Sequence, residues 1–275
     1  MGDNLAGDRE AVAQAGDQVR VAGPAFPRYF NIGGHWVNSY KVFLCIGIYS
    51  GILLSAAVAE RSGISPLRLG AGCLLVAILG LIGARVYHLA VFFRRYSRDR
   101  FWAEAWNPKR GGLSVFGILI AVPFSWLVAS LLGIRPAVFW DHMSIGVVFG
   151  GAWIRFGCVC NGCCGGKESH GWFARRQHDT QGIYKRRIPV QWLEIGWWLL
   201  AGLGLIWLWP ARFPPGSYAL GVLTWYGLGR FWLEPLREAP DLVYGRVRVD
   251  QVVAALLAIV AGGALLHLMT GTLNE

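Results

Sequence analysis

The feature that most constrains this chain is a series of apolar runs, each about 20 residues long, which is the length a helix needs to cross a bilayer. We expect spanning helices over residues 41–59, 69–93, 112–133, 138–157, 191–210, 217–235 and 249–270. Only 15% of the residues are charged, whereas a soluble domain carries roughly a quarter. The sequence therefore predicts an all-α polytopic membrane protein with about seven transmembrane helices.

Two stretches of the chain lack such apolar runs. Acidic and basic groups alternate with Ala and Gly over most of residues 1–34, which predicts a mobile polar tail. Residues 158–190 separate the fourth and fifth predicted spans and are long enough to form a small polar head outside the bilayer. The expected organisation is thus a tail, 1–34, followed by a membrane domain, 35–275, that carries the head.

The basic residues indicate the kind of partner. The formal net charge is +10, and the Lys and Arg side chains lie beside apolar spans and among Trp and Tyr rather than on a basic face of their own. This distribution favours anionic lipid over nucleic acid as the partner. The loops on the amino-terminal side of the predicted topology hold most of these residues, and the positive-inside rule then places that side in the cytoplasm.

Charged side chains within the apolar spans or at their ends are the clearest indication of function. An ionised group near the bilayer centre costs about 2.5–3.5 kcal/mol on insertion scales, so its presence needs a reason. The positions are Arg85, Asp141, Arg155, Glu194, Arg230, Glu234 and Arg237. Arginines outnumber acids in this set, and the planar guanidinium matches phosphate oxygens. An anionic phospholipid headgroup is the expected ligand, and a purely structural ion-pair network is the alternative.

Part of this set shares a helical face. Tyr226, Arg230, Glu234 and Arg237 are spaced by four, four and three residues, so they would align along one side of the sixth predicted span. That side would turn inward, away from the lipid tails.

A second cluster follows the fourth predicted span and is rich in cysteine and glycine. Its cysteines are Cys158, Cys160, Cys163 and Cys164. Structural zinc usually draws on two separated ligand pairs, and no second cysteine pair exists, so we expect no metal, although His170 and His178 could complete a site. A disulfide is a further alternative. The glycines between 157 and 166 would let backbone N–H groups approach an anion closely.

The run Arg155-Phe-Gly-Cys…Asn161-Gly-Cys-Cys-Gly-Gly-Lys resembles the signature of the prolipoprotein diacylglyceryl transferase family. Other segments resemble motifs of that family in the same order along nearly the whole chain after the tail. They are Gly80–Arg85, Gly111–Ser114, Asp141, Pro189–Glu194, and the set Tyr226, Arg230, Glu234 and Arg237 followed by Pro240-Asp241 and Gln251.

The resemblance implies a seven-span enzyme of the bacterial plasma (inner) membrane that needs no cofactor. Such an enzyme moves the diacylglyceryl group of phosphatidylglycerol to the lipobox cysteine thiol of a prolipoprotein. A thioether forms, and glycerol phosphate leaves. The implied partners are phosphatidylglycerol, or another anionic phospholipid, and the signal-peptide region of a prolipoprotein. We expect a monomer.

On this interpretation the candidate catalytic residues are Arg155, Arg230 and Tyr40. Substrate binding is assigned to Arg85, Asp141, Gly157, Asn161, Gly162, Tyr226, Glu234 and Arg237. Supporting positions are Ser114, Gln191, Glu194 and Gln251.

One departure from the family pattern concerns the proton acceptor. After Gly111-Gly-Leu-Ser114 the family commonly has a His or a Tyr, whereas this chain has Val115-Phe116, neither of which accepts a proton. Tyr40 and His142 are the remaining candidate bases, and a hydrogen-bonded core histidine is an equal interpretation of His142. Two alternatives therefore stay open: a non-catalytic protein that binds anionic phospholipid, and a divergent transferase with another acceptor.

Overall fold

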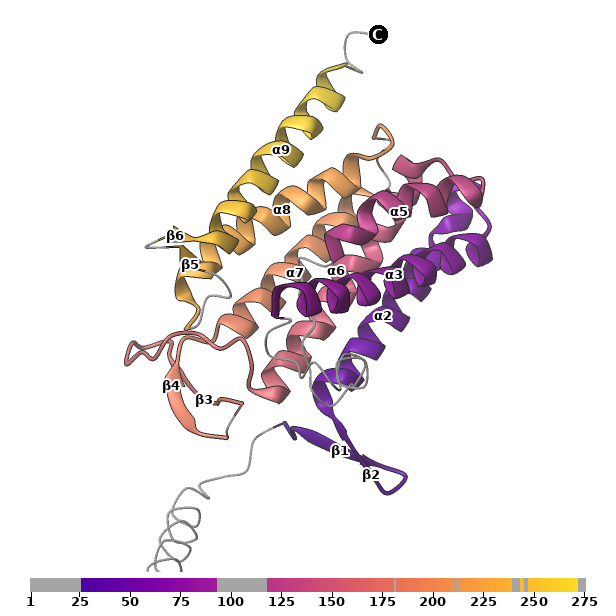
Figure 1. The fold of residues 1–275 in the computed structure, drawn as a ribbon. Coiled ribbons are helices and arrows are strands. Elements are labelled where there is room, and N and C mark those ends of the chain that lie inside the picture. Colours follow the sequence, from indigo (N-terminus) through magenta and orange to yellow (C-terminus); the bar gives the residue numbers. More distant parts are fainter. Residues whose placement is uncertain are drawn as a thin grey trace, which may run out of the picture.

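The fold is a bundle of long helices with short β-hairpins gathered at one end, as seen in a computed structural model (Figure 1). The structure describes residues 26–92, 118–180, 182–209, 211, 213–238, 243–244 and 247–271. The main helices are α2 (Ser39–Ala57), α3 (Pro66–Phe92), α5 (Ile118–Leu131), α6 (Pro136–Asn161), α7 (Val190–Leu208), α8 (Ser217–Leu233) and α9 (Val249–Gly271). Short 3-10 turns follow two of them, η1 (Ala59–Ser62) and η5 (Glu234–Leu236).

Five of these helices, α2, α3, α6, α7 and α9, are long and apolar enough to cross a membrane. Helices α5 and α8 are shorter, with 14 and 17 residues. The predicted span 112–133 is described only from residue 118 onward, and α8 ends before Pro235, whose ring cannot continue an α-helix. The prediction of a helical, multi-pass membrane protein is confirmed at this level.

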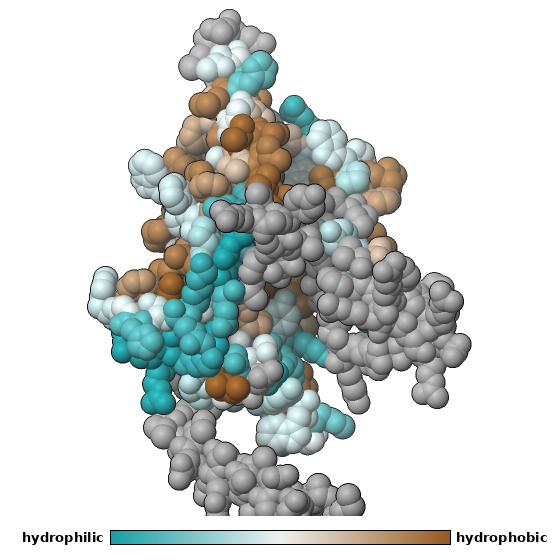
Figure 2. Space-filling view, turned by 60° about the vertical axis from the view of Figure 1, so that its left-hand side comes forward, coloured by the Kyte–Doolittle hydropathy of each residue, from teal (hydrophilic) through white to brown (hydrophobic). Residues whose placement is uncertain are grey.

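The outer faces of the helices are apolar, as lipid contact requires. Figure 2 shows apolar side chains over much of the upper part of one face, with polar side chains gathered toward its lower end. Large apolar side chains on α7 and α9 are more than half exposed, namely Leu200, Leu203, Ile206, Trp207, Leu256, Ile259, Val260 and Leu266. A soluble protein rarely leaves so large an apolar surface open to water.

Each β-hairpin is a two-stranded antiparallel ribbon. The hairpins pair β1 (Tyr29–Ile32) with β2 (His35–Asn38), β3 (Arg175–His178) with β4 (Tyr184–Arg187), and β5 (Val243–Tyr244) with β6 (Val247–Arg248). The first hairpin overlaps the end of the segment predicted as a tail, and it is the first regular structure among the described residues. The second lies between α6 and α7, within the stretch predicted as a polar head.

Helices α2 and α6 approach closely through facing glycines. Gly47 and Gly51 of α2 lie against Gly150 and Gly146 of α6, and a Cβ on Gly146 would lie 2.6 Å from the carbonyl oxygen of Gly51. Glycines spaced by four residues let helix backbones pack tightly in a membrane. This contact aligns the start of α2, which carries Tyr40, with the end of α6.

Helix α6 ends at a left-handed glycine. Gly162 adopts φ 71° and caps the helix, and the Cys163 amide turns back to donate to the carbonyl of Cys158 at 3.2 Å. A residue with a side chain would be strained in this conformation. The reversal brings the residues after the helix back over its last turn.

Candidate functional site

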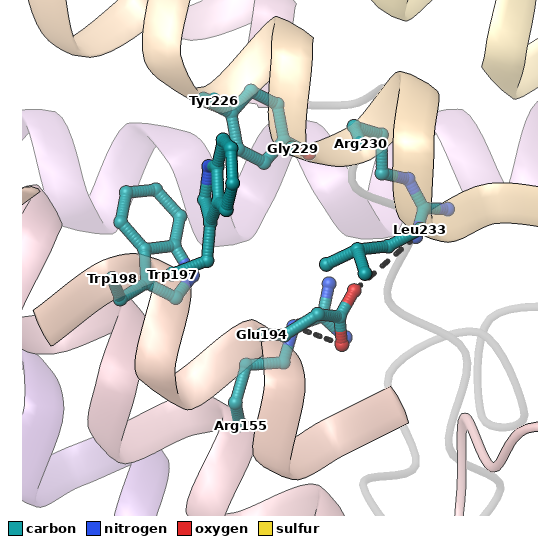
Figure 3. Close-up of a pocket in the computed structure, with 8 residues that line it drawn as sticks. All are labelled: Arg155, Glu194, Trp197, Trp198, Tyr226, Gly229, Arg230 and Leu233. Carbon is teal, nitrogen blue, oxygen red and sulfur yellow. Dashed lines mark ion pairs between the residues drawn. The ribbon is translucent and has the colours of Figure 1, made fainter. Parts of the chain in front are cut away.

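The centre of the site is Glu194 on α7, which lies between two arginines from neighbouring helices. Its Oε2 is 3.1 Å from Nε of Arg155 on α6, and its Oε1 is 3.6 Å from Nη1 of Arg230 on α8. Figure 3 shows the carboxylate between the two guanidinium groups. One acid thus holds two cations near each other, a position where an anionic group could contact both.

Arg230 is held on its other side by two further carboxylates. Its Nη2 lies 3.1 Å from Oε2 of Glu234 and 3.0 Å from Oδ2 of Asp250, at the start of α9. Glu234 also lies within 3.8 Å of Nη1 of Arg237 and 3.9 Å of Nη1 of Arg248. These contacts fix the Arg230 guanidinium in one orientation, which suits a group that must meet a ligand in a set geometry.

Among the described residues, the network holds more positive than negative groups. Its four guanidiniums, Arg155, Arg230, Arg237 and Arg248, meet three carboxylates, Glu194, Glu234 and Asp250. The side chains of the three acids are only 7%, 0% and 3% exposed, whereas those of Arg155 and Arg230 are 16% and 12% exposed. The accessible part of the network is therefore cationic.

A pocket opens beside Arg155 and Arg230. Its lining residues come from α6, α7 and α8 and are Arg155, Glu194, Trp197, Trp198, Tyr226, Gly229, Arg230 and Leu233 (Figure 3). Charged groups line one part of it and aromatic rings another (Figure 3).

Stacked aromatic side chains hold α7 against α8 at this pocket. Trp197 and Trp225 stack at 4.2 Å, and the indole N–H of each donates to the backbone carbonyl of the other at 2.9 Å. Trp198 stacks on Tyr226 at 5.6 Å. Because buried indole N–H groups need acceptors, this reciprocal pair specifies the register in which Glu194 faces Arg230.

Three thiols converge near the same arginines. The Sγ atoms of Cys158, Cys163 and Cys164 all lie within 4.8 Å of one another, and Cys158 is buried. Tyr40, on α2, lies against the same turn of α6, since a Cβ on Gly157 would lie 3.3 Å from its Cα. Its catalytic role stays a prediction.

One of these thiols has an altered acidity. Cys164 lies beyond the end of α6, and hydrogen bonds from the thiols of Cys158 and Cys163 lower its pKa. Burial opposes this effect, and the positive charges of Arg155 and Arg230 add to it. Because the three thiols share these hydrogen bonds, a proton lost from the cluster belongs to the group rather than to one sulfur.

The glycines and amides of the signature act mainly on packing. Gly157 lies inside α6, where a Cβ would meet Cβ of Phe43 at 3.0 Å, and the Gly162 amide donates to the carbonyl of Val159 at 3.3 Å. These two glycines therefore serve the helix and its cap, and anion binding by the rest of the 157–166 loop stays a prediction. Gln191 donates to the carbonyl of Cys163 at 3.0 Å, and Asn161 accepts from Asn38 at 2.9 Å.

Asp141, which the sequence groups with the intramembrane arginines, lies elsewhere. Its carboxylate accepts hydrogen bonds from the amides of Gly216 at 2.6 Å and Ala219 at 2.9 Å, at the amino terminus of α8. Arg230 is 13 residues further along the same helix, about 20 Å at the usual rise per residue. Asp141 therefore caps α8 instead of facing the pocket.

Of the other predicted positions, some make contacts of their own outside the ion pairs given above, and some lie outside the residues that the structure describes. Arg85 is buried in α3, which packs against α2 and α5. The His142 ring contacts the carbonyl of Val138 at 2.8 Å and the hydroxyl of Ser62 at 3.0 Å, as a hydrogen-bonded core histidine does. Gln251 donates to the carbonyl of Phe231 at 3.3 Å. Ser114 and the Val115-Phe116 pair lie outside the described residues.

Comparisons with known proteins concern nearly all of these elements. The family model described as prolipoprotein diacylglyceryl transferase matches residues 27–268. The chain belongs to this family. Proteins named phosphatidylglycerol–prolipoprotein diacylglyceryl transferase are similar to it. One from Streptococcus equi subsp. zooepidemicus is 29% identical, covering 86% of this chain and 92% of that protein, and one from Clostridium kluyveri is 25% identical, covering 83% and 91%.

The whole arginine network lies within the region that the diacylglyceryl transferase family model matches. The network contains two residues that sequence reasoning missed, Asp250 and Arg248. Both lie at the start of the last span, where a charge would be interpreted as an interfacial residue. The signal that could have found Asp250 is its position directly beside Gln251, which the family resemblance had already marked.

Proposed function

We propose that this chain transfers the diacylglyceryl group of phosphatidylglycerol to the lipobox cysteine of a prolipoprotein, with formation of a thioether and release of glycerol phosphate. Family membership supports the reaction, and the names of its relatives specify the donor and the acceptor. The observation that carries the proposal is the pairing of Arg155 and Arg230 around Glu194, beside a pocket lined by both arginines.

The arginines suit the bond that breaks in this reaction. As the carbon–oxygen bond to the phosphate breaks, charge develops on the departing phosphate oxygen, and fixed guanidinium groups stabilise such charge without reorganising. Arg155 and Arg230 would hold the phosphate. Glu194, Glu234 and Asp250 would hold the two arginines in place, with Arg237 bound to the same carboxylate of Glu234.

The acceptor thiol has to lose a proton before it attacks, because the thiolate is the nucleophile. Tyr40, whose backbone lies against Gly157 of α6, is the candidate that the sequence offers, and it could accept this proton only as the ionised phenolate. We assign His142 a structural role, because both of its ring nitrogens already contact protein oxygens.

The proposed setting is the bacterial plasma (inner) membrane, with seven spans counting α5 and α8, and with one chain as the working unit. The hairpin end of the bundle would face outward, where exported prolipoproteins arrive. This orientation sets the proposal against the positive-inside rule, since the β3–β4 hairpin carries Arg175, Arg176, Lys185, Arg186 and Arg187.

Rescue of bacteria depleted of their own transferase tests the proposal. We expect the wild-type gene to restore growth and lipoprotein modification, the Arg155→Ala gene to fail, and an Arg68→Ala gene to succeed, because Arg68 is exposed on α3. Equal rescue by Arg155→Ala would refute the assigned site. Failure of all three genes, with the proteins present in the membrane, would refute the proposed activity.

The Val115-Phe116 pair favours a second candidate, a protein that binds anionic phospholipid without turning it over. Purified protein would then retain phosphatidylglycerol through Arg155 and Arg230 yet form no thioether with a lipobox peptide. Mass spectrometry of the bound lipid and of the peptide distinguishes the two functions.

A further inference from the structure

The three thiols beside the arginine network have the arrangement of a metal site. Zinc–sulfur bonds of about 2.3 Å in a tetrahedron set sulfur atoms roughly 3.8 Å apart. The Sγ atoms of Cys158, Cys163 and Cys164 all lie within 4.8 Å of one another, so small side-chain rotations would bring them to that spacing. The sequence predicts no metal because it has no second cysteine pair. The chain reversal at Gly162, however, brings Cys163 and Cys164 back to Cys158.

The backbone holds the thiols in this arrangement. Cys163 is bound twice, through its amide to the carbonyl of Cys158 and through its carbonyl to the side chain of Gln191 at 3.0 Å. Cys164 adopts φ 59°, a left-handed conformation that is uncommon for a residue with a side chain. Such a conformation has a cost, and it persists where the surrounding structure requires it, often at functional sites.

The charges around the thiols also suit a metal–thiolate group. A divalent cation with three thiolates has a formal charge of −1, and with the acceptor thiolate it has a charge of −2. Arg155 lies three residues before Cys158 in α6, so the two side chains share one face of that helix. A cationic surrounding lowers the cost of negative charge in a site of low dielectric.

The ligand set identifies the class of ion, and the described residues supply three of the four ligands of a tetrahedral site. Soft thiolates select zinc and similar thiophilic ions over magnesium or calcium. Within the described part of the chain, no fourth His, Cys, Asp or Glu ligand atom joins the three thiols. Catalytic zinc sites have this composition, three protein ligands and a fourth position for water or substrate.

We propose that Cys158, Cys163 and Cys164 bind a zinc-class cation whose fourth position takes the acceptor cysteine as a thiolate. This inference rests on the proposed transferase function and supplies what Val115-Phe116 lacks, because a thiol coordinated to zinc is deprotonated without a side-chain base. The acceptor proton passes to solvent when sulfur binds the metal. The sulfur then attacks the diacylglyceryl carbon, and the electron pair of the breaking carbon–oxygen bond leaves with the glycerol phosphate held by Arg155 and Arg230.

Metal content of the purified full-length protein tests the site without reference to activity. After loading with zinc and removal of unbound ion, we expect one zinc per chain by elemental mass spectrometry. Cys158→Ser and Cys164→Ser should lose it, and Cys164→His, which keeps a ligand, should retain it. Cys160→Ser is the matched control, because Cys160 is buried in the same helical turn and lies outside the three-thiol group.

Cobalt in place of zinc reports on the open position. We expect the visible absorption of the cobalt protein to change when a lipobox peptide is added, and not when the same peptide has serine in place of cysteine. Zinc-free wild-type protein, equal loss of zinc in Cys160→Ser, or a disulfide within the cluster as isolated would each overturn the metal site.

Activity measurements separate this inference from the function on which it rests. Removal of the metal by a chelator should lower the initial rate of diacylglyceryl transfer by at least ~100-fold, the lower end of what proton removal usually contributes. Full transfer by the metal-free protein would refute the metal site and leave the transferase function standing. Peptide binding at cobalt with no transfer from phosphatidylglycerol would refute the function and leave the metal site standing.

Discussion

At the residue scale, the central feature is one carboxylate shared by two arginines. Glu194 contacts Arg155 and Arg230 on different helices and is only 7% exposed. A carboxylate buried to this degree must be paired, and removal of its partners would leave a costly charge. Glu194 therefore has two roles, since it holds the fold together across α6, α7 and α8 and keeps both guanidiniums pointed at the same place.

Replacement of Arg155 by lysine keeps the positive charge and removes the planar guanidinium, which can bind a phosphate through two hydrogen bonds. We expect Arg155→Lys to lower kcat/KM for transfer by about 10²–10³-fold, the usual cost of losing one oriented donor at developing charge. Initial rates with labelled phosphatidylglycerol measure this effect. Arg68→Lys, an exposed position on α3, should leave the rate unchanged. Rates for Arg155→Lys close to wild type would mean that a positive charge alone is sufficient.

Truncation of Glu194 should affect stability as well as activity. Glu194→Ala leaves two arginines without their shared carboxylate, and breaking a buried pair costs about 3–5 kcal/mol of unfolding free energy. Denaturant unfolding in detergent measures the loss. Glu168→Ala is the control, because Glu168 pairs with Lys185 at the exposed surface of the hairpin end and should change stability little. Similar losses in both variants would argue against a special role for Glu194.

The sequence predicted how part of this site is arranged, but it grouped Asp141 with residues from which the structure separates it. The spacing of Arg230, Glu234 and Arg237 predicted one helical face, and the structure joins all three through ion pairs. The sequence groups Asp141 with them because a buried acid needs a positive partner. The amino terminus of α8 meets that need as well as an arginine does. The sequence shows that a buried charge needs a compensating group. It does not show whether that group is an arginine or a helix terminus.

At the element scale, the facing glycines of α2 and α6 determine where Tyr40 lies. Gly47 and Gly51 pack against Gly150 and Gly146, so the two helices remain close along their length. Without this approach the Tyr40 phenol would move away from Arg155 and the thiols. The position of a candidate catalytic group thus depends on residues that have no side chain.

A methyl group at this contact should separate the helices. In Gly146→Ala the added Cβ would lie 2.6 Å from the Gly51 carbonyl oxygen and 2.7 Å from the Ser55 hydroxyl. Overpacking of this kind typically costs about 1–3 kcal/mol. We expect a lower unfolding temperature and slower transfer.

Gly204→Ala on α7 is the matched control, because an added Cβ there meets nothing within 4 Å. It should keep its activity and be equally or slightly more stable, since alanine is the better helix former. A loss of stability and activity in Gly204→Ala as large as in Gly146→Ala would show that the effect is not specific to the α2–α6 contact.

The helices were predictable from apolar length, but their ends and the hairpins were not. Helix α6 runs to Asn161, beyond the predicted 157, because the polar and cysteine residues of its last turn continue the helix until Gly162. The hairpins have strands of two to four residues, too short for an alternating pattern to be recognised.

At the scale of the whole molecule, the three hairpins lie at the same end of the bundle as the arginine network (Figure 1). This end is strongly basic, which would normally place it in the cytoplasm. The proposed function requires it to face outward, and the arginines to which the proposal assigns phosphate binding would be a functional reason for part of that charge. Orientation is therefore a sensitive test of the account at this scale.

An epitope tag in the β3–β4 turn measures the orientation. We expect a tag after Thr180 to be accessible in intact spheroplasts, and a tag after Ser62, between α2 and α3 at the other end, to become accessible only after permeabilisation. The reverse pattern would place the site in the cytoplasm, where exported prolipoproteins do not arrive, and would exclude them as acceptors.

The most direct measurement of the central claim is the mass of a lipobox peptide after incubation with purified protein and labelled phosphatidylglycerol. The account predicts a thioether-linked diacylglyceryl group on the peptide cysteine and an equal amount of free glycerol phosphate. It predicts that Arg155→Ala and Arg230→Ala abolish both products and that Arg68→Ala forms them at the wild-type rate. An unmodified peptide with wild-type protein that binds the lipid, or full product with either arginine variant, would contradict it.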